Sequence, residues 1–183
     1  GAEVVTPQSL TLVRATVAAV EAELRIERLS PPKPASVVSS GWSLPRLDVL
    51  GVHGAVLRHG STTTRLSLRH SELLLLIAES PDGLTTAELG VALSEDEQAQ
   101  VTIRAEMSRL RSSLGPVELS SRPYRLKNAI ETDVVRVRGD LARGQLRRAV
   151  ASYRGPILPT STAPAIERLR EDLHMHLRSC LLT

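Results

Sequence analysis

The sequence has a single cysteine, Cys180, and aromatic residues make up only 2% of its 183 residues. A lone cysteine excludes an internal disulfide and a zinc cluster built of cysteines, and it favours a reduced, cytoplasmic protein. The scarcity of aromatic rings, with no phenylalanine at all, requires an aliphatic core and largely excludes stacking platforms for single-stranded nucleic acid. With 42% apolar residues, the chain is long enough for one generous domain or two small ones.

Long apolar runs and the usual catalytic motifs are also missing. The longest apolar run, 73–78, is far shorter than the roughly 20 residues that cross a bilayer, and no signal-peptide pattern opens the chain. The sequence has no Gly-rich phosphate loop and no Gly-x-Ser-x-Gly elbow. His174 and His176 would lie about 200° apart on a helix, so they cannot chelate one metal ion. We therefore expect no enzyme activity, no catalytic residue, no metal, no cofactor and no membrane partner.

Charge is unevenly distributed along the chain. The formal net charge is only +3, but residues 104–127 hold six basic residues against Glu106 and Glu118 alone. Residues 47–103, by contrast, hold three basic and eight acidic residues. A local basic patch of this kind suits contacts with phosphate groups.

The first 46 residues divide into an amphipathic segment and a linker. Residues 1–29 carry apolar residues at alternating spacings of three and four, which predicts a helix. This seam either packs on a neighbouring domain or pairs with a second copy of the chain. Residues 30–46 are rich in proline, serine and glycine and indicate a linker. The seam consists of Leu10, Val13, Val17, Val20 and Leu24.

The section 47–127 predicts short strands, then helices, then a hairpin. Alternating apolar residues broken by glycines over 47–68 indicate a small antiparallel sheet. Thr85 and Glu88 have the spacing of a capping box, and the segment 117–127 predicts two short strands about a tight turn. This order is typical of a winged helix-turn-helix domain. The expected helices are 69–80, 86–93 and 98–114.

The final section, 128–183, is expected to be helical. Helices are predicted over 132–143, 145–154 and 165–182, and such hairpins pack on a neighbour. The predicted fold class is therefore mainly α with small antiparallel β-sheets: a winged helix-turn-helix domain, a C-terminal helical segment and an N-terminal helix. The last helix has one apolar face, formed by Ile166, Leu169, Leu173, Leu177 and Leu181.

The predicted helix 98–114 has a narrow apolar stripe and an outer face of small and polar residues. Taking Ile103 as zero, Met107, Leu110 and Leu114 fall within about 40° of it at 100° per residue. A helix of this length spans roughly 25 Å, which is ample to cross a major groove about 12 Å wide. Arg109 is placed to read guanine and Arg111 to reach phosphate. Most such faces are merely solvated, but the basic residues of the adjoining hairpin favour DNA.

Residues 47–127 resemble the OmpR/PhoB-type winged-helix effector domain. The resemblance lies in Met107-Ser-Arg-Leu110-Arg111-Ser-Ser-Leu114 and in Pro123-Tyr124-Arg125. Pro123 replaces a frequent glycine of that family, and Leu93 replaces a frequent tryptophan. The resemblance implies binding to double-stranded DNA. By position it implies contacts from Thr102, Ala105, Glu106, Arg109, Arg111 and Arg122, and the basic hairpin adds Arg125 to the candidate set.

Two weaker resemblances concern the ends of the chain. Residues 128–183 are similar to the helical bacterial transcriptional activator domain of the Streptomyces antibiotic regulatory proteins, and the segment 1–29 is similar to the closing helix of a GAF sensor domain. Together they imply the C-terminal effector part of a longer sensor protein, with a homodimer formed through this helix or the sensor. The first resemblance rests on Asp140-Leu141, Gly144, Leu146, Ala149 and Tyr153-Arg-Gly-Pro-Ile-Leu-Pro159.

The acidic cluster Glu95, Asp96 and Glu97 has two readings. It can stabilise the N-terminal dipole of the following helix. By resemblance to related winged-helix activators, it can instead contact RNA polymerase. The function expected for the whole chain is sequence-specific transcriptional regulation, with the helix 98–114 in the major groove and the hairpin tip 120–122 on the backbone or minor groove. The alternative is a protein–protein interaction module that uses the same scaffold.

Overall fold

The structure, a computed structural model, describes residues 44–94 and 99–182. All of them belong to one compact unit of the chain, Gly41–Thr183. The predicted helix 1–29, nearly all of the linker 30–46 and the acidic cluster Glu95, Asp96 and Glu97 lie outside the described residues.

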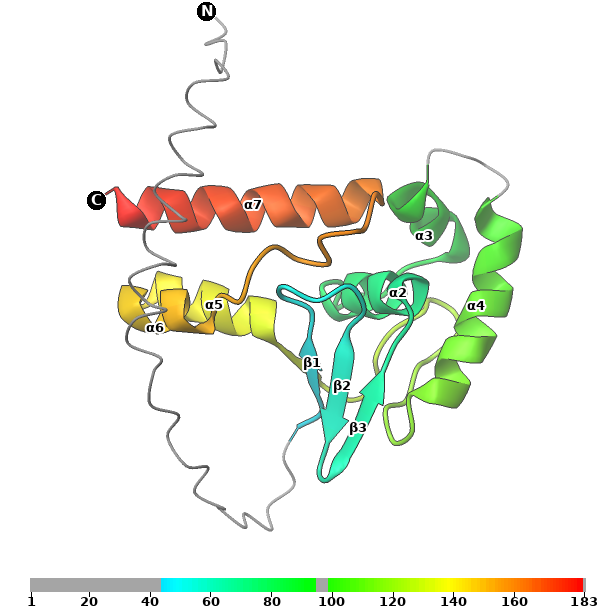
Figure 1. Cartoon of the computed structure of the whole chain (residues 1–183). Helices are drawn as coiled ribbons and strands as arrows, with labels where there is room; N and C mark the ends of the chain where they lie inside the picture. Colours follow the sequence, from blue (N-terminus) through cyan, green and yellow to red (C-terminus); the bar gives the residue numbers. More distant parts are fainter. Residues whose placement is uncertain (1–43, 95–98, 183) are drawn as a thin grey trace, which may run out of the picture. The chain divides into compact units, whose positions relative to one another are not determined.

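The described residues form an α+β fold of six helices and one four-stranded sheet. Along the chain, three strands come first, and three helices, a hairpin, one short strand and three more helices follow (Figure 1). The elements are β1 (Arg46–Asp48), β2 (Val56–His59), β3 (Thr62–Arg65), α2 (Leu68–Ala78), α3 (Thr86–Leu93), α4 (Ala99–Ser113), β4 (Glu131–Thr132), α5 (Asp133–Ala142), α6 (Leu146–Ser152) and α7 (Pro164–Leu181).

The sheet is mixed, with the strand order β3-β2-β1-β4. The pairs β1–β2 and β2–β3 are antiparallel, which confirms the expected antiparallel pairing of the leading strands. The fourth strand, β4, runs parallel to β1, so the expectation of a purely antiparallel sheet is wrong. Strand β4 could not be predicted, because its two residues are too few to show an alternating pattern.

The core is aliphatic, as the composition requires, and α2 lies at its centre. Every residue from Ser71 to Ile77 is buried, because α2 contacts α3, α4 and α7. Figure 1 shows α4 at one end of this unit and α5 with α6 at the other. Helix α7 contacts both α3 and α5 and so links the two ends.

Local sequence signals placed the helices well. Helix α3 begins and ends at the predicted residues, and its capping box is present: Thr85 N donates to Glu88 Oε2 at 2.7 Å, and Glu88 N donates to Thr85 Oγ1 at 3.2 Å. The hydrogen bonds that the Glu88 carboxylate accepts from the backbone and the side chain of Thr85 hold its pKa below its usual value. The other five helices begin and end within two residues of the predicted positions.

The C-terminal section shares the sheet and the core of the preceding section. The buried Asp133 carboxylate accepts hydrogen bonds from the backbone N–H groups of Val49 and Leu50, each at 3.0 Å. Burial raises the pKa of Asp133 against these bonds. Ile157 forms an antiparallel bridge with Leu50.

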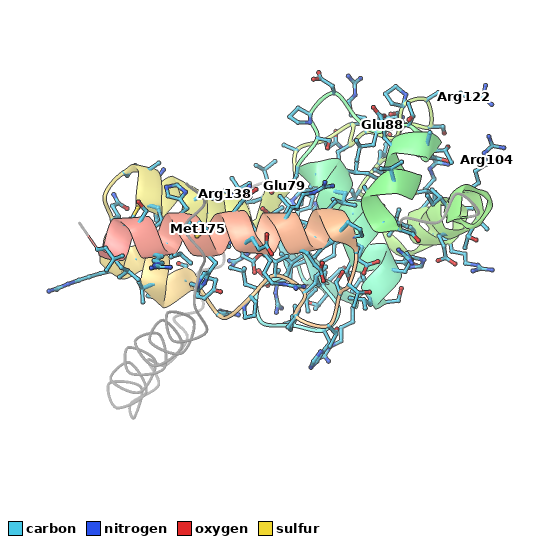
Figure 2. The ribbon with its side chains drawn as sticks, turned by 90° about the horizontal axis from the view of Figure 1, so that it is seen from above. Glu79, Glu88, Arg104, Arg122, Arg138 and Met175 are labelled. Atoms are coloured by element: carbon cyan, nitrogen blue, oxygen red, sulfur yellow. The ribbon has the colours of Figure 1, made fainter. Side chains whose placement is uncertain are left out.

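Helices α7 and α5 make further polar contacts that stabilise the C-terminal section and join it to the preceding one. Arg170 on α7 donates to the backbone oxygens of Ile157, Leu158 and Ser161, and so fixes the loop before its own helix. Arg138 on α5 forms an ion pair with Glu79, directly after α2; both are labelled in Figure 2. Residues 128–182 are therefore part of the same packed unit as the helices before them.

Candidate nucleic-acid interface

Helix α4 buries one narrow stripe of its surface. Ile103, Met107, Leu110 and Leu114 are all at most 3% exposed, which confirms the predicted core face. They pack toward α2 and α3, both of which α4 contacts. The stripe is one residue wide per turn, so the side of the helix opposite to it stays open for other contacts.

The opposite face of α4 is exposed over residues 102–112, and within that range it carries no large apolar side chain. At 15 residues the helix is about 22 Å long. Small residues alternate with polar ones along this strip, so its backbone can approach a flat or grooved partner closely. The exposed strip consists of Thr102, Arg104, Ala105, Ser108, Arg109 and Ser112.

One flank of α4 turns toward α2. Glu106 is half-buried, and its Oε2 lies 3.1 Å from Nε2 of His70 on α2. Its other oxygen, Oε1, accepts a hydrogen bond from Nη1 of Arg109 at 2.6 Å. The predicted guanine-reading arginine is therefore already ion-paired, although its side chain is 68% exposed.

The other flank of α4 faces the segment 117–127, which we call the hairpin. Arg111 Nη2 donates to the backbone oxygen of Ser120 at 3.1 Å and to Ser121 Oγ at 2.8 Å. The guanidinium also lies over the ring of Tyr124. Arg111 thus holds the hairpin beside α4. A guanidinium has five N–H donors, so this position leaves donors for the expected phosphate contact, which stays a prediction.

The hairpin is closed by backbone bonds but is too short to count as two strands. Ser120 N donates to Arg125 O at 2.8 Å, and Lys127 N donates to Glu118 O at 2.9 Å. The side chains of Lys127 and Glu118 pair as well. That hydrogen bond and the lysine charge lower the pKa of Glu118. The predicted pair of strands is therefore present only as a hairpin with an isolated bridge.

A second set of bonds attaches the hairpin to the entrance of α3. Leu84 and Tyr124 exchange backbone hydrogen bonds of 2.9 and 2.8 Å, and Thr85, the next residue, caps α3. Gly83 has a φ of +84°, and a Cβ there would lie 2.8 Å from the Tyr124 oxygen. Only glycine meets both conditions without a shift of the hairpin.

Three arginines on this side of the unit have no carboxylate partner among the described residues. Arg104 lies on α4, whereas Arg122 and Arg125 lie on the hairpin, and all three are exposed. Figure 2 shows Arg104 and Arg122 projecting outward at the same end of the molecule, far from Met175 of α7. The helix strip and the hairpin tip together make one basic surface, which we call the α4–hairpin face.

All seven predicted DNA-contact residues lie on the α4–hairpin face or at its flanks, but their side chains differ in exposure. Thr102, Ala105, Arg122 and Arg125 are exposed, whereas Glu106 and Arg111 are half-buried by internal contacts. His70, which anchors Glu106 across 36 residues of chain, was not among the predicted residues. No spacing rule could have revealed a contact between two different helices.

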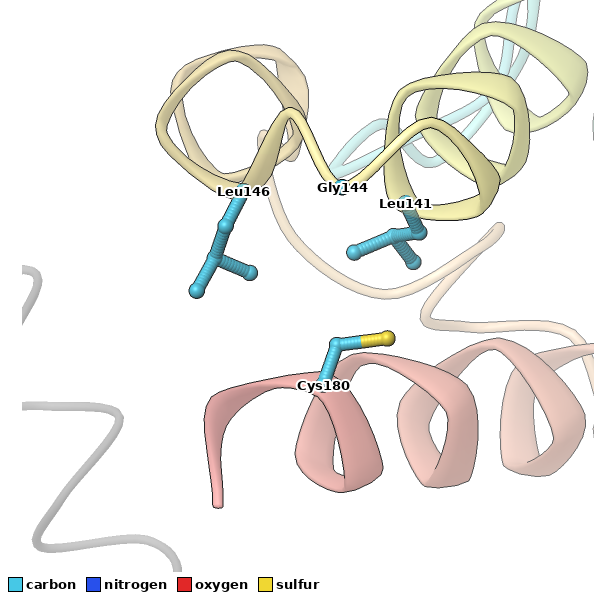
Figure 3. Close-up of a pocket in the computed structure, with 4 residues that line it drawn as sticks. All are labelled: Leu141, Gly144, Leu146 and Cys180. Carbon is cyan, nitrogen blue, oxygen red and sulfur yellow. The ribbon is translucent and has the colours of Figure 1, made fainter. Parts of the chain in front are cut away.

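Outside this face, the features that bear on chemistry are a pocket and the arrangement of potential metal ligands among the described residues. A pocket of about 270 Å³ lies between the α5–α6 turn and the last turns of α7, lined by Leu141, Gly144, Leu146 and Cys180 (Figure 3). Its lining is apolar apart from the thiol. Within 44–94 and 99–182, no group of three potential ligands is placed to hold a metal ion. No helix in these ranges could cross a membrane.

A nearly buried carboxylate on strand β1 is held by two arginines. Asp48 accepts hydrogen bonds from Arg46 Nε at 2.9 Å and from Arg58 Nε at 3.0 Å. Burial alone would raise the pKa of Asp48, but the hydrogen bonds and charges of Arg58 and Arg46 outweigh it and lower the pKa. This cluster joins β1 to β2, because both arginine side chains bind the same carboxylate.

Comparison with known proteins adds one relative. No protein-family model matches the chain. The chain is 44% identical over 182 residues to an uncharacterized 47.3 kDa protein in the thcA 5′ region of Rhodococcus erythropolis. The alignment covers the whole of this chain but only 40% of the relative, so the chain spans less than half of the relative's length.

Proposed function

We propose that residues 47–127 form a winged-helix domain that binds double-stranded DNA, with α4 in the major groove and the hairpin tip on the backbone or minor groove. The observation that carries the proposal is the α4–hairpin face. Its exposed arginines on two elements, Arg104, Arg122 and Arg125, lack carboxylate partners in the described part of the chain. Unpaired cations arranged along a helix and a neighbouring loop suit a polyphosphate backbone.

The composition of the α4 strip supports docking of the helix in a groove. Ala105, Ser108 and Ser112 are small, so side chains do not hold the helix backbone away from the base edges. A helix about 22 Å long exceeds the roughly 12 Å width of the major groove. A protein-binding surface of similar size has aromatic and apolar anchors at its centre, and the described part of the strip has none.

The contacts of Arg111 support joint action of helix and hairpin. Because its guanidinium bonds to Ser120 and Ser121, the two basic elements keep a fixed spacing before any DNA arrives. A preformed surface avoids the ordering entropy of a loose loop on binding. Phosphate contacts from the hairpin can then set the register in which α4 meets base edges.

The relative is compatible with a DNA-binding part of a longer regulator. The chain aligns end to end with 40% of that protein, which leaves the remainder of the relative for a further domain. In this proposal the expected sensor would lie upstream, and a homodimer would bind two half-sites. Activity of the whole protein and contact with RNA polymerase belong to the same proposal.

The test is fluorescence anisotropy with a random-sequence DNA duplex over a salt series. We expect binding to weaken with salt at a log–log slope of about −0.9 per phosphate neutralised. The variant Arg104→Ala/Arg122→Ala should lose about two such contacts and bind with a correspondingly shallower slope. The matched control, Arg168→Ala/Arg178→Ala, removes the same charge from exposed positions on α7 and should keep the wild-type slope.

Two results contradict the proposal. If the two double variants lose equal affinity for the duplex, binding depends on the net charge of the protein and not on the α4–hairpin face. Absence of binding by the wild-type protein at low salt means that the face does not bind DNA, and it favours the protein–protein interaction module instead.

A further inference from the structure

Glu106 is the only acidic residue of α4, and it lies within the proposed DNA-binding face. A carboxylate there opposes DNA phosphates. Its contacts give it a specific task, because both of its oxygens are occupied: Oε2 by His70 and Oε1 by Arg109. Its side chain is only 17% exposed, so DNA would meet the arginine before the carboxylate.

The anchor of this arrangement comes from another helix. His70 on α2 is 14% exposed, and its Nε2 lies 3.1 Å from Glu106 Oε2. An ionised carboxylate only accepts hydrogen bonds, so Nε2 is the donor in this pair. The carboxylate is therefore fixed to the α2–α4 core, and it holds the exposed end of Arg109 at a defined place on the strip.

We propose that Glu106 determines sequence specificity by restraining Arg109. The inference rests on the proposed DNA-binding function and concerns the regulation of that same face. In the ion pair the charge of Arg109 is largely neutralised, so the pair attracts a DNA phosphate only weakly. A guanine edge offers O6 and N7 side by side, and a held guanidinium can direct its remaining donors at both. The restraint thus lowers the affinity for non-specific DNA more than the affinity for the recognised sequence.

The central variant is Glu106→Gln. Glutamine keeps the shape of the side chain and an oxygen that accepts from His70, but it removes the charge that holds Arg109. Two duplexes serve as probes: a random-sequence duplex, and a duplex selected from a random library by repeated binding to the wild-type protein. The measured quantity is the ratio of the two affinities at salt concentrations from about 50 to 200 mM.

We expect Glu106→Gln to bind the random duplex about tenfold more tightly, with a salt slope steeper by about 0.9, because the freed Arg109 reaches a phosphate. Affinity for the selected duplex should change less, so the specificity ratio falls. In the background of Arg109→Ala, the same substitution should leave the ratio unchanged, because Glu106 acts through Arg109.

Control variants separate restraint from simple charge. Glu118→Gln also removes an ion-paired carboxylate, the exposed one that pairs with Lys127 on the hairpin. It should raise the affinities for both duplexes together without changing their ratio. His70→Ala retains the Glu106 charge but removes its anchor and should lower the ratio, by less than Glu106→Gln. Thermal unfolding of each variant shows whether its fold is intact, and His70→Ala carries the test if Glu106→Gln unfolds.

The outcomes are distinct. A wild-type ratio in both Glu106→Gln and His70→Ala overturns the inference while leaving DNA binding in place. An equal fall of the ratio with and without Arg109 also overturns it and indicates that Glu106 itself accepts from a base, such as the amino group of cytosine. Failure of the wild-type protein to bind any duplex overturns the proposed function and the inference together.

Discussion

The guanidinium carbon of Arg111 lies 5.6 Å from the centroid of the Tyr124 ring. Arg111 belongs to α4, and Tyr124 is the buried residue by which the hairpin joins the entrance of α3. One arginine therefore connects the exposed helix to the hairpin by a cation–π contact and two hydrogen bonds. The spacing between the two basic elements depends on this side chain.

Replacing Arg111 by methionine should loosen the hairpin. Methionine keeps much of the apolar stem but loses both hydrogen bonds and the cation–π contact, so we expect the free energy of unfolding to fall by about 1–2 kcal/mol. Amide exchange at Ser120 and Lys127, whose N–H groups close the hairpin, should become faster. Arg104→Met on the same helix is the control and should change neither. Unchanged exchange in Arg111→Met would show that the hairpin holds its place without this arginine.

Gly83→Ala should destabilise the protein more than Gly60→Ala. Both glycines have positive φ, so alanine costs about 1–2 kcal/mol at either position. At Gly60 a Cβ meets nothing within 4 Å, whereas at Gly83 it lies 2.8 Å from the Tyr124 oxygen and 3.0 Å from Pro123 Cγ. We expect at least about 1 kcal/mol of additional loss at Gly83 by urea denaturation. Equal losses would mean that the hairpin shifts freely.

Asp48 should give the sheet a pH-dependent contribution to stability. Its pKa is lowered in the folded protein, so its stabilising effect is present above the usual pKa of 3.8 and is lost as the pH falls through the folded value. Asp48→Asn should therefore reduce the free energy of unfolding by about 1–2 kcal/mol at neutral pH, a figure that allows for the partial exposure of both arginines. The difference from wild type should narrow at an acid pH well below 3.8, where Asp48 becomes protonated in the folded protein. Urea titrations at the two pH values measure it, and a difference that persists in acid contradicts the ion-pair explanation.

Sequence patterns correctly predicted the features that depend on residues close together in the chain. The burial of Ile103, Met107 and Leu110 follows from the helical period alone, and the capping box needs only Thr85 and Glu88. Both were correct because each is decided within a few residues. Helix positions could therefore be read from the sequence to within two residues.

The contacts that shape the candidate interface depend on tertiary packing. Glu106 meets His70 only because α2 and α4 cross, and Arg111 meets Ser121 only because the hairpin returns along α4. A helical wheel places Glu106 and Arg111 on opposite flanks but does not say which neighbour covers each flank. The parallel strand β4 was missed for a similar reason, since its partner β1 lies far away in sequence.

A chain that ends at residue 127 should not unfold cooperatively. It lacks β4, the Asp133 acceptor for the Val49 and Leu50 amides, and the bridge from Ile157. Two buried N–H groups would lose their partners, at about 1–3 kcal/mol each, in addition to the lost apolar contacts. Near-UV circular dichroism and urea titration should show a broad transition, and adding the segment 128–183 as a separate peptide should sharpen it. A sharp transition with the wild-type midpoint would show that the C-terminal section is dispensable for folding.

Arg109 and Arg122 should contribute to DNA binding in different ways. Arg109 lies on the exposed strip of α4, so its loss should cost about 1–3 kcal/mol on a selected duplex and relax the preference for that sequence. Arg122 lies at the hairpin tip and has no carboxylate partner among the described residues, so its loss should weaken binding to all sequences alike and reduce the salt slope by about one contact. Anisotropy titrations of Arg109→Ala and Arg122→Ala against selected and random duplexes separate the two effects. Negligible losses in both would remove these residues from the interface, and a uniform loss in Arg109→Ala would make it a phosphate contact instead of a base reader.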